Sequence, residues 1–501
     1  MATKRARRTK RRRRASASTN LQHAARMRQH QPPRVPIHTH PPFLHEPANF
    51  GSPRTRQQLT QSQAGQIIPI PPPKRLPSVI GLAEVVGAQY VQEITQSGQL
   101  VFQSAGDSGF GGTWDLELVA QVMAMDLHRP NPADRPAFFF HLGDVIYNHQ
   151  YNFPESKANM YQPQFYVPYE HYAAKILAIP GNHDSNPQED PNSIDAFEAN
   201  FCADPPKSDA ALTNLLNSPN RAPMYQPGVY YRLDAPFAQI LALFSNGGEH
   251  EGVIRDNVAG NTQYEFLVEQ LKEIKAARDG GKRVALIVAT HHPPFSGGGG
   301  HSGSSHMLAD LDAAFTEAGI GPDAVLSGHA HDYQRFTRTV QVGGRQMEVP
   351  YIVVGTGGHG PIQPVKPNFQ RQPVRTPVRG ISPTGVEDHS LQQYFNGFGH
   401  LIVTVTDRVL TIDLIGTKTQ THLPVDSVTV DLASNKITHE TPPFSHPVNG
   451  EEQHAVHGRS PSPTGGPLPK DSCCFWRTMH VTRLYAEDDP PANHRTVSES
   501  L

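Results

Sequence analysis

The chain has 501 residues and a formal net charge of −2, and its 47 prolines concentrate towards the two ends, so it holds fewer domains than the roughly three that length alone suggests. Its three cysteines, at positions 202, 473 and 474, exclude a fold held together by a disulfide framework. No apolar run reaches the ~18 residues that a membrane-spanning helix needs, so no membrane span is predicted.

Residues 1–78 are predicted to form a disordered arm that is first basic and then rich in Pro, Gln and His. The first fourteen residues contain nine Lys or Arg and no acidic residue, so the rest of the chain carries 35 basic against 46 acidic residues, a net charge of −11. Because basic arms bind anionic surfaces, we expect a weak contact between residues 4–14 and polyanions. The basic start lacks the apolar segment of a secretory signal, so a cytoplasmic location is expected.

One folded region is predicted from residue 79 to residue 441. Apolar residues at helical spacing predict helices at residues 113–127, 195–201, 264–274 and 307–318. Apolar or alternating runs predict strands at residues 100–105, 138–142, 176–180, 229–233, 238–244, 284–289, 323–327, 349–354, 401–415 and 428–438, the last two as hairpins. Polar or Gly-rich segments predict loops at residues 148–168, 205–227 and 296–305, the first and last of them over the functional site. Residues 442–501 return to Pro, Ser, Gly and His, which predicts a disordered tail.

Five of the predicted strands end in a polar cluster. The clusters are Gly-Asp-Ser-Gly at 106–109, Gly-Asp-Val-Ile-Tyr at 143–147, Gly-Asn-His-Asp at 181–184, Thr-His-His at 290–292 and Gly-His-Ala-His at 328–331. Open α/β sheets bind ligands at the carboxyl ends of their strands, so these side chains are expected to lie near one another. Carboxylates, imidazoles, an amide and a phenol together are the ligand mixture that a two-metal hydrolytic site needs.

In order and content, the five blocks resemble those of the calcineurin-like metallophosphoesterases, over about residues 100–415. More narrowly, they are similar to the purple acid phosphatase branch. In most of the superfamily the first block is Asp-x-His, and its histidine is a metal ligand, whereas this chain has Gly109 at that position. Tyr147 lies at the position where the purple acid phosphatase branch has a tyrosine ligand instead. The resemblance implies a single α/β domain with a four-layer αββα sandwich. The Pro-rich residues 1–78 leave no room for the N-terminal β-sandwich of the plant enzymes.

The resemblance also implies two bound metal ions, Fe(III) together with Fe(II), Zn(II) or Mn(II). The ligands it implies for the first ion are Asp107, Asp144, Tyr147 and His331. Those it implies for the second ion are Asn182, His291, His329 and again Asp144, which would bridge the two ions.

Five further residues are candidates for supporting roles. His183 resembles the family histidine that binds the substrate phosphate and protonates the leaving group. His301 lies roughly where related enzymes carry a second substrate histidine, with a plain solvent-facing histidine as the alternative and His306 as a weaker substitute. We expect His292 to pack behind the site, and Asp184 to orient His183 or a loop without a direct role.

The predicted function is metal-dependent hydrolysis of phosphoesters, with phosphomonoesters as the first expectation. A phosphodiesterase on the same scaffold, including one that acts on nucleotides, is the alternative, because the loop sequences at 148–168 and 296–305 do not decide between them. A different class is a non-catalytic polyanion-binding protein with a relic hydrolase domain. The basic arm favours this class, whereas the intact set of seven metal-ligand positions argues against it.

Overall fold

The computed structural model describes residues 64–110, 115–147, 160–190, 192–203, 224–249, 251–297, 301, 303–360, 378–381, 387–417, 423–442 and 448–449. All of them lie in the first of the two units into which the chain divides, Met1–Gln453. The predicted basic stretch at residues 4–14, most of the C-terminal tail and most of the 205–227 loop lie outside the described residues.

The described helices are short, and none of them is long and apolar enough to cross a membrane. They are α3 (Leu82–Val86), α4 (Ala88–Ser97), α5 (Asp115–Asp126), α7 (Asn182–Ser185), α8 (Ser193–Phe201), α10 (Thr262–Asp279) and α11 (Ser305–Ala318), with single turns at Pro132–Asp134 and Gln162–Tyr166. The predicted helices at 113–127, 195–201, 264–274 and 307–318 are therefore confirmed as α5, α8, α10 and α11. The helices α3 and α4 were not predicted.

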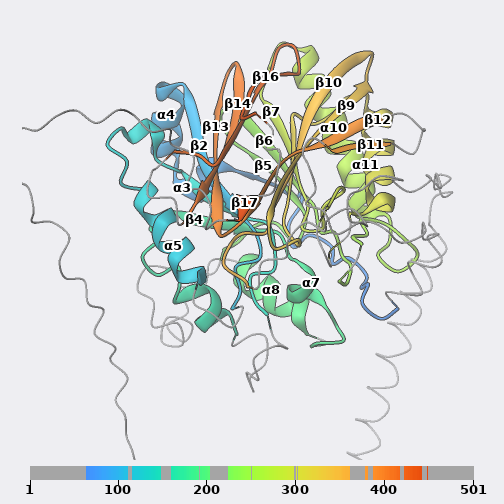
Figure 1. Cartoon of the computed structure of the whole chain (residues 1–501). Coiled ribbons are helices and arrows are strands. Elements are labelled where there is room, and N and C mark those ends of the chain that lie inside the picture. The colour runs from blue at the N-terminus through green and yellow to red at the C-terminus, as the bar shows by residue number, and fades with distance from the viewer. Residues whose placement is uncertain are drawn as a thin grey trace, which may run out of the picture. The chain divides into compact units, whose positions relative to one another are not determined.

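The strands fall into two sheets (Figure 1). The ten-stranded sheet contains β1 (Val79–Gly81), β5 (Tyr231–Asp234), β6 (Ala238–Ala242), β7 (Ala285–Ala289), β8 (Ala324–Ser327), β10 (Arg345–Val354), β9 (Tyr333–Val342), β12 (Glu387–Asn396) and β11 (Val378–Ile381), in that spatial order, with β17 (Val448–Asn449) paired to β12. The seven-stranded sheet contains β16 (Lys436–Glu440), β15 (Asp426–Asp431), β14 (Val409–Gly416), β13 (Gly399–Thr406), β2 (Gln99–Ala105), β3 (Phe138–His141) and β4 (Lys175–Ala178).

Each sheet has a parallel section. The strands β2, β3 and β4 are parallel neighbours in one sheet, and β6, β7, β8 and β10 are parallel neighbours in the other. Parallel strands end at the same edge of their sheet, so each sheet gathers its loops there. Each sheet therefore gathers the polar clusters that follow its own parallel strands at one edge.

The strands of the ten-stranded sheet are apolar on both faces. On β6 and β7, Ile240 and Ile287 point into a core cluster shared with the seven-stranded sheet, while Leu241 and Val288 pack in a second cluster with α10 and α11. The period-2 alternation of strand side chains produces this division. Helices α10 and α11 lie on one side of the strands and α4 and α5 on the other (Figure 1), which confirms the predicted four-layer αββα sandwich.

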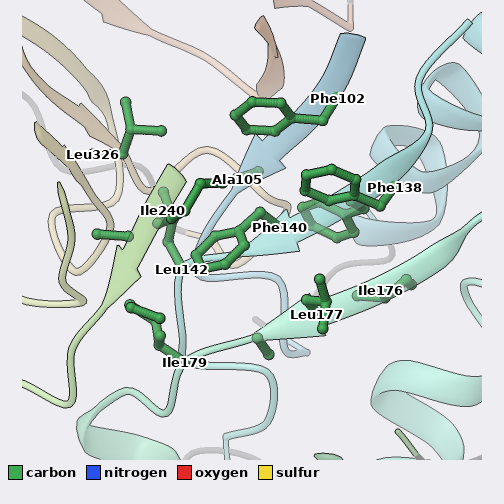
Figure 2. Close-up of a cluster of buried hydrophobic side chains, with 14 of the residues drawn as sticks. Phe102, Ala105, Phe138, Phe140, Leu142, Ile176, Leu177, Ile179, Ile240 and Leu326 are labelled. Atoms are coloured by element: carbon green, nitrogen blue, oxygen red, sulfur yellow. The ribbon is translucent and has the colours of Figure 1, made fainter. Parts of the chain in front are cut away.

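Aromatic side chains fill the interior just below the strand ends. Phe102 on β2 stacks on Phe138 of β3, with ring centroids 4.9 Å apart and planes 6° from parallel. Figure 2 shows the side chain of Phe140 on β3 on the side of Ile240 of the other sheet, within the same cluster of buried side chains. This packing fixes the spacing of the strands and therefore of the loops that follow them.

Ordered contacts begin earlier than predicted, so the boundary at residue 78 needs correction. Residues 64–74, which we call the N-terminal strap, run along the domain. Ile67 is buried against Val253, the backbone N–H of Ile68 donates to Asn246 Oδ1 over 3.1 Å, and that of Ile70 donates to Ala259 O over 3.2 Å. Prolines prevent a helix here, but they do not prevent an extended segment from burying its isoleucines. At the other end, β17 lies inside the predicted tail and pairs with β12.

Candidate metal centre

The candidate ligands lie at the carboxyl ends of parallel strands from both sheets. Asp107 follows β2, Asp144 follows β3 and Asn182 begins α7 after β4. From the ten-stranded sheet, His291 follows β7 and His329 follows β8. All five side chains are buried, each with an exposed fraction of 1% or less. The fold therefore brings together polar groups that are up to 222 residues apart in the sequence.

The backbone is strained at three of these residues. Asp107, Asp144 and His329 have positive φ angles of 60°, 53° and 69°. Residues with a Cβ atom avoid this left-handed conformation, which costs of order 1 kcal/mol or more when the surrounding structure imposes it. Strain that coincides with buried polar side chains at strand ends indicates a functional site.

One group of donor atoms comes from Asp107, Tyr147 and His331. The hydroxyl of Tyr147 donates to Asp107 Oδ1 over 3.1 Å and lies 3.3 Å from His331 Nε2, which in turn is 3.5 Å from Asp107 Oδ1. Two ligands about 2.1 Å from a common ion lie roughly 3.0–3.4 Å apart at tetrahedral or octahedral angles. The three atoms therefore have nearly the spacing of ligands around one metal ion.

A second group surrounds the side-chain oxygen of Asn182. His291 Nε2 and His329 Nδ1 each lie 3.0 Å from Asn182 Oδ1, and His291 Nε2 is 3.3 Å from Asp144 Oδ2. The ligand atoms of Asp144, His291 and His329 lie within 4.8 Å of one another. Burial and the neighbouring histidines hold the pKa of His329 well below its usual value, so this imidazole is neutral and suited to a metal.

The protonation of His291 tests whether a cation fits the second group. Its Nδ1 lies 2.8 Å from Leu142 O, which can only accept, so Nδ1 carries a proton. Its Nε2 then faces two oxygen atoms. Burial lowers the pKa of His291, but the charge of Asp144 outweighs burial and raises this pKa to about 9. Within the described residues, the buried Asp144 Oδ2 also accepts no well-aligned hydrogen bond. A metal ion at this place would replace the extra proton and satisfy these atoms.

The environment of Tyr147 likewise indicates that a cation fits the first group. Burial, followed by the charges of Asp107 and Asp144, raises the pKa of the phenol well above its usual value. The phenol therefore stays neutral unless a strong positive charge lies beside its oxygen. A cation of high charge held by Tyr147, Asp107 and His331 would supply that charge.

The structure explains why Gly109 accompanies Tyr147. A Cβ atom at position 109 would lie 2.5 Å from Tyr147 Cδ2 and 2.9 Å from Ile146 Cα. Side-chain Cβ atoms essentially never approach other atoms so closely. The tyrosine ring thus occupies the space that a side chain at 109 would need, so a histidine at 109 and a tyrosine at 147 exclude each other.

His183 lies beside both donor groups. Its backbone N–H donates to Asp144 Oδ1 over 2.9 Å, and its ring lies 4.3 Å from the ring of Tyr147. Its Nδ1 is 3.0 Å from Glu189 Oε1, and its Nε2 is 3.2 Å from Glu249 Oε1. Burial lowers the pKa of His183, but Asp144 and the two glutamates together raise it well above its usual value, so the ring is protonated.

His301 is buried, which contradicts the alternative of a solvent-facing histidine. Its ring centroid lies 4.3 Å from that of His329 and 5.0 Å from that of His331, and only 8% of the residue is exposed. Burial, followed by the charge of His331, lowers the pKa of His301 to about 4. His306, the predicted substitute, is buried in the first turn of α11.

His292 and Asp184 hold the loops of the site, as the sequence suggested. The two ring nitrogens of His292 lie 2.8 Å from Ser245 Oγ and 2.8 Å from Gly248 O. Asp184 Oδ2 accepts from the backbone N–H groups of Val145, at 3.1 Å, and Gly181, at 2.9 Å. Asp184 therefore ties the loop of Asp144 to the turn that carries Asn182.

Sequence reasoning missed His359, Glu189 and Glu249. His359 stacks on Tyr147, with ring centroids 3.5 Å apart and planes 8° from parallel, and its Nδ1 is 3.1 Å from Gly109 O. A signal for it existed, since the predicted strand at 349–354 also runs into a Gly-rich polar cluster, Gly-Thr-Gly-Gly-His. The two glutamates lie in loops next to other acidic residues, and no local pattern distinguishes them from those neighbours.

Residues 105–333, which contain all five blocks, match the family model of the calcineurin-like phosphoesterases. The chain is also 30% identical over 112 residues to a protein of Arabidopsis thaliana described as probable purple acid phosphatase 20. That similarity covers 22% of this chain and 25% of the plant protein, so the chain spans about a quarter of the curated relative it matches. These matches confirm the resemblance that the five blocks predicted.

Two solved structures show weaker similarity. The purple acid phosphatase PPD1 from yellow lupin (Lupinus luteus) seeds matches with a TM-score of 0.42 and 17% identity, over 66% of this chain and 54% of that one. GAP50, described as the anchor in the inner membrane complex of Plasmodium, matches with a TM-score of 0.41 and 13% identity, over 70% of this chain and 90% of that one.

The contact between positions 109 and 147 predicts the effect of Gly109→Ala. The added methyl group collides with the ring of Tyr147, and overpacking of this kind costs about 1–3 kcal/mol. We expect the free energy of unfolding, measured by chemical denaturation, to fall by this amount. The matched control is Gly280→Ala, because a Cβ atom there meets its nearest neighbour at 3.4 Å. Equal stability of the two variants would show that Tyr147 does not need the space.

Proposed function

We propose that this chain, whose residues 105–333 form a calcineurin-like phosphoesterase domain, hydrolyses phosphoesters at a dinuclear metal centre. The observation that carries the proposal is the convergence of donor atoms from seven strand-end residues into two adjacent groups. The two groups are joined by a backbone hydrogen bond of 2.7 Å from His329 to Asp107 Oδ2. Phosphoester hydrolysis needs such paired positive charges around a phosphate.

The two groups differ in ligand chemistry. The first ion would be held by Asp107, Tyr147, His331 and Asp144, and the hard phenolate and carboxylate oxygens among them suit Fe(III). The second would be held by Asn182, His291, His329 and the bridging Asp144, a softer set that suits Fe(II), Zn(II) or Mn(II). When bound, the two ions would neutralise the phosphate and lower the pKa of water enough to supply a nucleophile near neutral pH.

His183 is proposed to donate a proton to the leaving group. Its main chain is fixed to Asp144, and its neighbours keep the ring protonated. Because Nδ1 is held by the buried Glu189, Nε2 is the atom that reaches the departing oxygen. His301 lies against the rings of His329 and His331, on which basis we propose that it contacts the bound phosphate.

The similarity to purple acid phosphatases favours phosphomonoesters as substrates, with phosphodiesters as the alternative on the same scaffold. Residues 4–14 are proposed to add a weak contact with polyanionic substrates or surfaces. The intact ligand set speaks against a relic domain, since a protein that only binds polyanions has no need for seven buried ligand residues, three of them with strained backbone.

The proposed iron site predicts colour. Tyr147 should bind Fe(III) as a phenolate and give a visible charge-transfer band, which Tyr147→Phe should abolish even where iron stays bound. Visible absorption spectra of the two iron-loaded proteins, normalised to measured iron, test this. A colourless wild type, or a variant that keeps its colour, would remove Tyr147 from the first group.

The proposed general acid predicts a dependence on the leaving group. An alkoxide needs a proton as its bond to phosphorus breaks, and such help is worth about 10²- to 10⁴-fold. His183→Ala should therefore lower kcat by about this factor for an alkyl phosphate and much less for p-nitrophenyl phosphate, whose leaving group departs unprotonated. Metal content should barely change. An equal loss for both esters would instead indicate that His183 positions the phosphate.

A further inference from the structure

The carboxylate of Glu249 lies among the side chains that are proposed to bind the substrate. Glu249 lies in the loop after β6, and its Oε1 is 3.2 Å from His183 Nε2 and 3.5 Å from Asn182 Nδ2. Its Oε2 is 3.9 Å from His301 Nδ1. An oxyanion thus already contacts both histidines that are proposed to bind a phosphate oxyanion.

The position of Glu249 is built into the fold, because its loop is held from two sides. Gly248 O lies 2.8 Å from the ring nitrogen Nε2 of His292, which packs behind the metal ligands. On the other side, Asn246 binds the backbone of Ile68 in the N-terminal strap through both atoms of its amide. The strap also places Gln66 against Gly248, where a Cβ atom would lie 1.6 Å from Gln66 Oε1. Glu249 is therefore a fixed element of the site.

Among the described residues, the charged group beside the Glu249 carboxylate is the protonated ring of His183, whose charge depends on pH. The groups that face it are His183 and Asn182 from α7 and His301 from the segment before α11, while the charge of Asp144 acts on it from the metal centre. In the part of the chain that the structure describes, no lysine or arginine pairs with it. With 44% of its side chain exposed, the carboxylate is open to solvent beside the proposed metal ligand Asn182.

We propose that Glu249 is a specificity-determining residue that disfavours doubly charged phosphate groups, so that the site prefers phosphoesters with a single negative charge. This inference rests on the proposed function. A phosphate that contacts His183 and His301 must lie beside the carboxylate, and a monoester dianion brings one more unit of negative charge to that carboxylate than a diester does. Because the second pKa of a phosphomonoester is about 6, Glu249 favours phosphodiesters, the alternative substrates of the proposed function, at neutral pH, and it no longer disfavours monoesters in acid.

The test removes the charge and keeps the shape, with Glu249→Gln. The ratio of kcat/KM for p-nitrophenyl phosphate to that for bis(p-nitrophenyl) phosphate is measured at neutral pH, and the affinity of the metal-loaded protein for inorganic phosphate is measured by calorimetry. We expect the ratio to rise about five- to tenfold and phosphate binding to tighten by a similar factor. Below pH ~5.5, where the monoester is singly charged, the change in the ratio should largely disappear.

Two further variants separate charge from other effects. Glu249→Asp keeps the charge, so it should keep most of the discrimination. Glu269→Gln removes an exposed carboxylate from the outer face of α10, so it should change nothing. A Glu249→Gln protein with an unchanged ratio and unchanged phosphate affinity overturns the proposal. So does an equal fall in kcat for both esters, since that would make Glu249 a positioning residue for His183.

The two proposals can fail separately. If the wild type hydrolyses neither ester, the proposed function fails, and calorimetry still decides the role of Glu249. Phosphate that binds equally to wild type and Glu249→Gln, or that binds to neither, then contradicts charge selection. If the wild type is active and the ratio of kcat/KM is the same in Glu249→Gln, the proposed hydrolase function stands, and Glu249 does not determine its specificity.

Discussion

The rest of the site depends on the buried carboxylate of Asp144. An ionised carboxylate in a protein interior is costly unless nearby charges and hydrogen-bond donors compensate for the lost water. Burial would raise the pKa of Asp144, but His291 and His183 hold it well below its usual range. The surroundings are shaped to reach this group: Asp144 adopts a positive φ, and Gly181 lacks the Cβ atom that would lie 2.1 Å from Asp144 Oδ1. These features fix one buried carboxylate beside the second group of donor atoms, and its charge also acts on Tyr147 of the first group.

The sandwich tolerates the strain and the buried charge at the site because the residues that stabilise the fold lie elsewhere, in its apolar layers. Alternating side chains on β6 and β7 fill two apolar layers, and the aromatic residues of β2 and β3 fill the interior below the strand ends. The strained ligand residues of the site lie in the loops that follow the strands. The strap and the loop of Glu249 then form the border of the site, so the substrate preference is decided by segments that the sheets themselves do not determine.

The sequence predicted the residues whose position follows from local rules. A polar cluster after an apolar strand must lie at a sheet edge, which is why the five clusters could be found without a structure. The choice of seven metal ligands among their residues, and the role of His183, came from the resemblance to the metallophosphoesterases. The same rule would have found His359 had it been applied to the strand before residue 355. Glu189 and Glu249 could not be found, because their roles depend on contacts with His183 across 6 and 66 residues of sequence that no local pattern predicts. The strap was missed because proline content was taken as a sign of disorder, whereas buried isoleucines and backbone hydrogen bonds hold it in an extended form.

The central claim is that two metal ions share Asp144, and the metal content of the purified protein tests it most directly. After expression in iron-replete medium, elemental analysis should find close to two metal ions per chain, at least one of them iron. In Asp144→Ala both ions should be lost or strongly reduced, because the shared ligand serves both groups, while circular dichroism should show that the sandwich remains folded. No metal at stoichiometric level in the wild type, with no gain of activity on reconstitution, would contradict the account. Retention of both ions by a folded Asp144→Ala protein would contradict the bridging role on which it depends.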